Sequence, residues 1–178
     1  MRGILTVAAL ALLGTPLLLA QWKTDGAPLP DTPWQKSDGD FGAMLVLTDR
    51  PEEFFAAWET KGPGVSMSET VNAKRGLPIV GVVLFTGCAP TREGLCNSTV
   101  TYTVFKPDGT VYGQQQEGEL WTGKQPPPKN EIQLSVGNMG IVLEPADPLG
   151  TYVMRAEVQD RVSQKTIRLE RHFKGVEH

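Results

Sequence analysis

The chain has 178 residues, and its 17 basic and 20 acidic side chains leave a formal net charge of −3. No run of basic residues is longer than the pair Lys74-Arg75, so the sequence argues against binding nucleic acid or anionic membranes, which attract clustered cations. The 19 Gly and 14 Pro separate short stretches rich in Val, Thr, Tyr, Phe and Ile, which favours many β-strands joined by tight turns.

Residues 1–20 have the layout of a secretory signal peptide. A single positive charge precedes the largely apolar stretch 4–13, Gly14 and Pro16 interrupt the segment, and Ala20 marks the predicted cleavage site. A retained membrane anchor is the alternative, because an apolar helix of about 20 residues can span a bilayer. Cleavage would leave the remainder in the periplasm or outside the cell, with no segment inserted in a membrane.

The rest of the chain divides into a polar segment and one folded domain. Residues 21–40 contain several prolines and glycines, and we expect an extended linker or a strap over the fold. Residues 41–174 are predicted to form a single β-sandwich domain, which is long enough to build its own hydrophobic core.

A short helix is predicted after the first strand. Asp49 lies three residues before Glu52, which is the spacing of a capping box at a helix N-terminus. Phe54, Phe55 and Trp58 then form an apolar stripe at helical spacing. We expect this stripe to pack on a sheet, because so short a helix is unstable in water without such packing.

Stretches of alternating or β-branched residues predict a series of short strands. The apolar stretch 77–85 is expected to be a central strand buried on both faces. The other expected strands before the last one cover residues 41–47, 65–71, 99–105, 110–115, 119–122, 131–136, 141–144 and 151–159. In the last strand Ile167, Leu169 and Phe173 mark the core face, whereas Arg171 breaks the alternation and predicts a bulge or an exposed end of the core.

The two cysteines, Cys88 and Cys96, enclose residues 89–95. An even number of cysteines in an exported chain is expected to oxidise, so we predict a disulfide bond between them. The spacing is not that of a Cys-x-x-Cys redox motif. The bond is therefore expected to hold one loop rigid.

The segment from Asp147 to Val158 resembles a motif of immunoglobulin-like, fibronectin-III-like and macroglobulin-like domains. In such domains Gly150 and Tyr152 would open the penultimate strand, with Tyr152 as the corner tyrosine. The whole chain also resembles small exported proteins of Gram-negative bacteria that carry this sandwich. The resemblance implies an all-β, immunoglobulin-like antiparallel β-sandwich with one short helix near the first strand and a periplasmic location, but it implies no activity.

Few residues are available for catalysis or metal binding. The two histidines are His172, expected to point away from the core, and His178 at the end of the sequence. No Gly-x-Ser-x-Gly sequence supports a catalytic triad, and too few zinc ligands remain once the cysteines pair. We therefore predict a non-enzymatic protein with no catalytic residue, no metal and no cofactor.

Trp121 is the best candidate for a binding surface, together with the nearby Pro126, Pro127 and Pro128. Exposed tryptophans are frequent anchors in protein interfaces. The alternative is that Trp121 clamps its own loop to the sandwich.

Two functions remain open. The first is an exported, non-enzymatic interaction module that presents loops or an edge strand to a protein or another component of the cell envelope. The alternative is a carbohydrate-binding or hydrolytic domain that uses surface carboxylates and aromatics. A concave pocket that combines an acidic residue with Trp121, Tyr112 or Tyr102 would favour the alternative, whereas a flat surface would favour the first.

Export can be tested by N-terminal sequencing of the protein recovered outside the cytoplasm. If residues 1–20 are a cleaved signal peptide, the mature protein begins at Gln21. Recovery of the chain in the membrane fraction with Met1 still present would contradict cleavage and favour the anchor.

Overall fold

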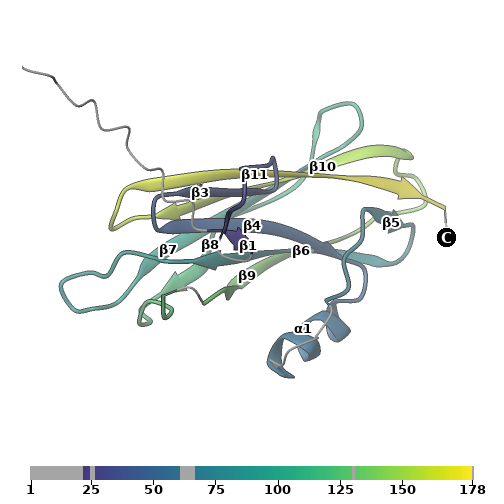
Figure 1. Cartoon of the computed structure of the whole chain (residues 1–178). Helices are drawn as coiled ribbons and strands as arrows, with labels where there is room; N and C mark the ends of the chain where they lie inside the picture. Colours follow the sequence, from purple (N-terminus) through teal and green to yellow (C-terminus); the bar gives the residue numbers. More distant parts are fainter. Residues whose placement is uncertain (1–21, 25–26, 61–66, 130, 178) are drawn as a thin grey trace, which may run out of the picture.

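The computed structural model describes residues 22–24, 27–60, 67–129 and 131–177 (Figure 1). The predicted signal peptide lies outside the described residues. Most of the described chain is β-strand, with one short helix, and the strands form two facing sheets. The predicted all-β sandwich is therefore confirmed. No helix in this part of the chain is long and apolar enough to cross a membrane.

The larger sheet has the strand order β5-β11-β10-β7-β8. Its strands pair antiparallel, except that β5 runs parallel to the end of β11. The strands are β5 (Asn72–Lys74), β7 (Asn97–Phe105), β8 (Val111–Thr122), β10 (Gly150–Asp160) and β11 (Lys165–Val176).

The smaller sheet has the order β3-β4-β6-β9, with all pairs antiparallel. A separate pair, β1 with β2, precedes it in the sequence. The strands are β1 (Lys23–Thr24), β2 (Ala27–Pro28), β3 (Gln35–Asp38), β4 (Phe41–Thr48), β6 (Pro78–Thr86) and β9 (Gln133–Val142).

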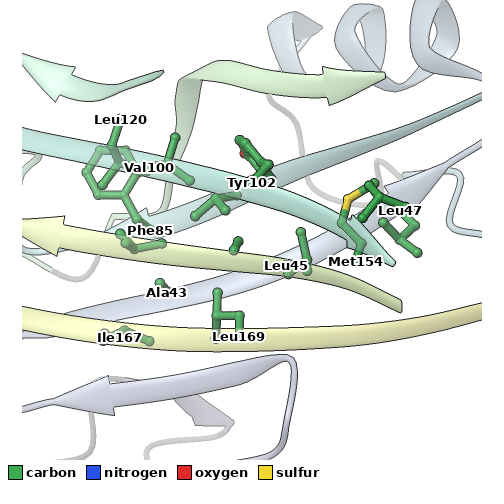
Figure 2. Close-up of a cluster of buried hydrophobic side chains, with 14 of the residues drawn as sticks. Ala43, Leu45, Leu47, Phe85, Val100, Tyr102, Leu120, Met154, Ile167 and Leu169 are labelled. Atoms are coloured by element: carbon green, nitrogen blue, oxygen red, sulfur yellow. The ribbon is translucent and has the colours of Figure 1, made fainter. Parts of the chain in front are cut away.

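The hydrophobic core lies between the two sheets, and alternate side chains of both sheets fill it (Figure 2). Along β10, the side chains of Tyr152, Met154, Ala156 and Val158 are at most 1% exposed. Gly81 of β6 makes room for Met154, because a Cβ atom at Gly81 would lie 2.1 Å from the sulfur. Removal of this apolar surface from water is the main force that holds the sheets together.

Helix α1 (Pro51–Thr60) covers part of the outer face of the smaller sheet (Figure 1). Its Phe54 is fully buried in a second apolar cluster that includes Val46 of β4 and Val82 of β6. Phe55 and Trp58 pack against the same cluster. As expected, β6 is therefore buried on both faces, since its other side chains point into the main core.

Among the described residues, the side chains of Asp49 and Glu52 do not form the hydrogen bonds of the predicted capping box. Arg50 directly precedes the helix, and its carbonyl accepts a bond from the Phe54 N–H at 3.0 Å. The Arg50 N–H bonds to the Thr48 hydroxyl at 3.1 Å. Pro51 thus occupies the first helical position, where its missing N–H costs nothing.

Strand boundaries in the middle of the chain differ from the prediction. The strand expected at 65–71 is found at β5 instead, and the described part of that stretch, 67–71, is irregular. The two strands expected at 110–115 and 119–122 are one bulged strand, β8, with Glu117 at φ 47°.

The strands expected at 131–136 and 141–144 are also one strand, β9, with a bulge opposite β6. Its Gly137 suggested a turn in the sequence. In the structure the backbone of Glu119 lies so close that a Cβ at Gly137 would be 3.0 Å from the Glu119 carbonyl oxygen. Here the glycine permits a close approach of two backbones.

Arg171 does not produce the predicted bulge, because β11 pairs with β10 without a break in register. Its guanidinium lies 4.8 Å from the centre of the Trp34 ring and pairs with Glu69 at 3.3 Å. Its side chain is 17% exposed. A long side chain that points inward can therefore carry its charge out of the core along the Trp34 ring.

The segment before Phe41 is joined to the sandwich. Its strand β3 extends the smaller sheet, and the Trp22 indole donates a hydrogen bond to the Lys36 carbonyl at 3.1 Å. The Pro33 carbonyl accepts a bond from the Glu170 N–H at 2.7 Å. The segment thus links the smaller sheet to the part of β11 that is not paired with β5.

Tyr152 has the geometry of a corner tyrosine. Its ring is buried and stacks on Phe173, with 5.4 Å between ring centres. Its hydroxyl donates a hydrogen bond to the Pro148 carbonyl at 2.7 Å, and burial raises its pKa. Gly150, with φ 141°, starts β10 beside Pro107.

Tyr152→Phe should lower the free energy of unfolding by about 1 kcal/mol, because it removes only the bond to the Pro148 carbonyl. Tyr152→Ala also opens a cavity and should cost about 3–5 kcal/mol. Urea melts measure both values, with the exposed Thr151→Ser as the control, expected within about 0.5 kcal/mol of the parent. Equal losses for Thr151→Ser and Tyr152→Ala would show that the strand is out of register.

Candidate functional site at the disulfide end

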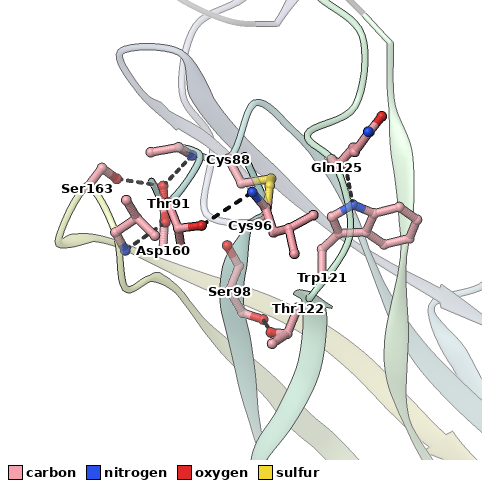
Figure 3. The surroundings of a disulfide bond; sticks show 12 residues. Cys88, Thr91, Cys96, Ser98, Trp121, Thr122, Gln125, Asp160 and Ser163 are labelled. Carbon is pink, nitrogen blue, oxygen red and sulfur yellow. Dashed lines mark hydrogen bonds between the residues drawn. A yellow bond between two sulfur atoms is a disulfide. The ribbon is translucent and has the colours of Figure 1, made fainter. Parts of the chain in front are cut away.

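The predicted disulfide between Cys88 and Cys96 is present, with 5.9 Å between the two Cα atoms (Figure 3). Both cysteines are buried, at 6% and 2% exposure. Inside the loop that they close, the Thr91 N–H bonds to the Leu95 carbonyl at 2.8 Å, and the Gly94 N–H to the Thr91 carbonyl at 3.0 Å. The loop is therefore held both covalently and by its own hydrogen bonds.

Asp160, at the end of β10, connects this loop to the turn between β10 and β11 (Figure 3). Its carboxylate accepts hydrogen bonds from the Ala89 N–H at 2.8 Å, the Ser163 hydroxyl at 2.7 Å and the Val162 N–H at 3.1 Å. The side chain is 1% exposed. A buried carboxylate is costly unless such donors surround it, so the geometry of both segments is tightly coupled here.

The loop after β8 is bonded to the disulfide as well. The Cys96 N–H donates to the Lys124 carbonyl at 2.8 Å, and the Gly123 N–H donates to the Cys96 carbonyl at 3.0 Å. Three segments that are far apart in sequence thus converge at one end of the sandwich. We call residues 88–96, 122–129 and 160–165 together the disulfide end.

Trp121 is half-buried and clamps the loop that follows it. Its indole N–H donates to the Gln125 carbonyl at 2.9 Å, and its ring centre lies 5.8 Å from that of the buried Phe85. The ammonium of Lys124 lies 5.2 Å from the ring centre and also pairs with Glu119, which lowers the pKa of that carboxyl. Trp121 therefore fixes the backbone at Gln125, directly before the Pro126–Pro128 segment.

The solvent-exposed surface of the disulfide end is mostly polar and carries charges of both signs. Its exposed residues are Pro90, Arg92, Glu93, Gly94, Thr122, Gly123, Gln125, Pro128, Lys129 and Gln164. The predicted candidates Cys88, Cys96, Trp121 and the three prolines are therefore brought together by the fold. Gly150 and Tyr152 lie at the other end of β10 and take no part in this surface.

The aromatic residues proposed for a carbohydrate or catalytic cleft do not line the described hollows of the surface. Tyr102 is buried in the core, where its hydroxyl donates to the Gly137 carbonyl at 3.2 Å and burial raises its pKa. The Tyr112 hydroxyl donates to the Asp147 carboxylate at 2.7 Å. Within the described residues no three His, Cys, Asp or Glu side chains are placed to hold a metal ion.

The role of Asp160 was missed by sequence reasoning, which placed it only at the start of a turn. Its bond to Val162, two residues on, is the local pattern expected of an aspartate in a turn. Its bond to Ala89 joins residues 71 positions apart, and no local signal predicts such a contact.

No protein family matches the chain, and a search of curated proteins finds no match either. Among solved structures it is similar to a family 123 glycoside hydrolase from Clostridium perfringens, at 13% identity over 78% of this chain and TM-score 0.44. It spans only 28% of that enzyme's length. It is also similar to a Niemann-Pick type C2 protein from the Japanese carpenter ant, at 12% identity over 74% of this chain and 89% of the other, with TM-score 0.41. These similarities are too low to support an argument about function.

The double variant Cys88→Ser/Cys96→Ser should still fold, because the two cysteines are only a small part of a main core built mostly by other side chains. We expect a loss of about 1–3 kcal/mol in the free energy of unfolding, measured by urea melts. Amide hydrogen exchange should accelerate within residues 89–95 and remain unchanged in β10. A variant that fails to fold would show that the disulfide supports the whole sandwich and not just this end.

Proposed function

We propose that the chain is an exported, non-enzymatic interaction module that presents the disulfide end to a protein or another component of the cell envelope. The observation that carries the proposal is that one covalent bond and a set of buried hydrogen bonds hold three separate loops at the same end. Binding residues are often found on loops that a rigid scaffold positions.

The two buried cysteines pack in the main apolar cluster, and the bond between them also holds a surface loop in place. It spans only eight positions in sequence, so it constrains the unfolded chain less than a long-range bond would. Loops that are already ordered lose less conformational entropy when a partner binds, which raises affinity without further contacts. This placement is what a preorganised binding surface requires.

Loops are a better binding element here than the edge strands. Strand β8 has three shifts in its register with β7, and β9 is bulged opposite β6. Strand β5 is three residues long, and the indole of Trp22 bonds to a backbone carbonyl of the four-residue β3. Short or bulged edges pair poorly with a further strand.

Two acidic groups near the disulfide end, Asp160 and Glu119, are engaged in structural bonds, which supports a non-enzymatic role. The Asp160 carboxylate is occupied by three donors, and Glu119 is paired with Lys124. His172 lies on the outer face of β11, where its Nε2 is 2.8 Å from a Glu170 oxygen.

The proposed location outside the cytoplasm is supported by the disulfide, since such bonds persist in oxidising compartments.

The alternative function, a carbohydrate-binding or hydrolytic domain built on Trp121, Tyr112 or Tyr102, is less well supported. All three side chains donate their hydrogen bond to groups of this chain.

The proposal can be tested by placing a photo-crosslinking amino acid at Arg92 or Lys129 in cells that express the protein. Asp108, exposed in the turn between β7 and β8 at the other end of the sandwich, is the matched control position. We expect both loop positions to capture the same partner and Asp108 to capture none. The double Cys→Ser variant should reduce the yield of the adduct about tenfold, because its loop must be ordered on binding.

Equal capture from Asp108 and from the two loops would contradict a binding surface at the disulfide end. Absence of any adduct from Arg92 and Lys129, with the protein folded and exported, would contradict it as well.

A further inference from the structure

The outer faces of the two sheets differ in chemistry. The outer face of the smaller sheet is apolar and carries α1, whereas the outer face of the larger sheet carries polar and charged side chains. A hollow of about 560 Å³ lies on this second face and extends over β7, β8, β10 and β11. Its volume is within the range of roughly 300–1,000 Å³ that is typical of small-molecule sites.

A straight row of polar side chains crosses the hollow. Gln114 of β8 pairs in register with Thr103 of β7, Thr103 with Arg155 of β10, and Arg155 with Glu170 of β11. All four residues line the hollow. Neighbouring strands are about 4.8 Å apart, so the row is about 14 Å long. It is perpendicular to the strands.

A second hollow, of about 450 Å³, adjoins the first at Glu170 and Lys36, which line both. Asp31 and Thr32 form its far side. The row from Gln114 to Glu170 is thereby extended beyond the edge of the sheet. An extended molecule has more room here than the first hollow alone offers.

The charges along both hollows balance. Each guanidinium is matched with a carboxylate on the neighbouring strand, since Arg155 pairs with Glu170 and Arg168 with Glu157, each at 2.7 Å. Lys36 and Asp31 add one further charge of each sign. A surface with no net charge does not attract polyanions, and it favours a ligand that is polar but uncharged.

The row retains donors and acceptors for such a ligand. In the described structure the hydrogen bonds of Arg155 and Arg168 to carboxylates use only Nε, which leaves their terminal nitrogens as donors. The Thr103 hydroxyl accepts a bond from Gln114 at 3.3 Å and can still donate its own proton. The guanidinium of Arg155 stacks over the Phe105 ring, with 4.7 Å from the guanidinium carbon to the ring centre. This contact fixes the orientation of the guanidinium group.

We propose that this row binds an uncharged glycan chain that lies across β8, β7, β10 and β11. Adjacent hydroxyls of a sugar act as both donors and acceptors, so they can pair with alternating amide, hydroxyl, guanidinium and carboxylate groups. The site lies on a different surface from the disulfide end and does not depend on the function proposed for that end.

The site binds and does not hydrolyse. Hydrogen bonds from Arg155 and His172 lower the pKa of Glu170 below its ordinary value, so this carboxyl stays ionised and accepts hydrogen bonds. A general acid for glycoside cleavage needs a raised pKa instead. Glu157 forms an ion pair with Arg168 on the neighbouring strand.

The simpler interpretation of these residues is that their cross-strand pairs only stabilise the sheet. The two interpretations differ in what Thr103 and Gln114 do. If the pairs are merely structural, removal of the Thr103 hydroxyl and the Gln114 amide should affect stability slightly and affect no binding. If the row is a site, the same change should weaken glycan binding in a protein that remains folded.

The test uses ¹⁵N-labelled protein, residues 21–178, and measures amide shifts on addition of four neutral hexasaccharides: chitohexaose, laminarihexaose, xylohexaose and mannohexaose. We expect at least one of them to shift amides of β7, β8, β10 and β11 together. Thr103→Val/Gln114→Ala should weaken its affinity about tenfold or more. Thr99→Val, on the same strand and the same face but outside the row, is the matched control and should leave the affinity unchanged.

A hexasaccharide of galacturonate serves as the charged probe. If it binds and the neutral hexasaccharides do not, the site is an anion site and the proposal is wrong. If none of the neutral hexasaccharides shifts these amides, or if Thr99→Val weakens binding as much as the double variant, the proposal is also wrong. Urea melts of each variant show whether the fold is retained, so a loss of binding is read only from folded protein.

Discussion

The two-residue period of a β-strand is the constraint on which the rest of this structure depends, and β10 shows it most directly. Tyr152 and Met154 point into the core, while Arg155 and Glu157 point outward. Strand β10 is paired on both sides, with β7 and with β11. A shift by one residue would therefore bury two charges and expose the core face at once. The apolar interior and the polar outer face are two results of one register.

Much of the fold could be predicted because its signals are local. The regular alternation in 99–105 and 151–159 matches β7 and β10 to within two residues at each end. Prediction failed where a residue serves a distant contact. Gly137 has the sequence pattern of a turn, but it allows β9 to approach Glu119 of β8. Likewise, the inward Arg171 is accommodated by Trp34, which is far away in sequence.

The candidate surfaces show the same division. The cysteines and Trp121 carry local signals, since their spacing and neighbouring prolines identify them in the sequence. The bond from Asp160 to Ala89 and the row from Gln114 to Glu170 carry none, because each forms only when strands from different parts of the chain are in register. Sequence reasoning could thus identify the disulfide end, but it could not find the polar row.

The order of strands in the larger sheet has a consequence for how the chain is made. Strands β10 and β11 come last in the sequence, yet both lie inside the sheet, between β5 and β7. When synthesis has reached only β9, the smaller sheet has all its strands, but the larger sheet still lacks its central strands β10 and β11. Folding of the larger sheet is therefore postponed until β10 and β11 have been synthesised. For the exported chain that we propose, this delay is an advantage, because no stable domain forms before β10 and β11 are available.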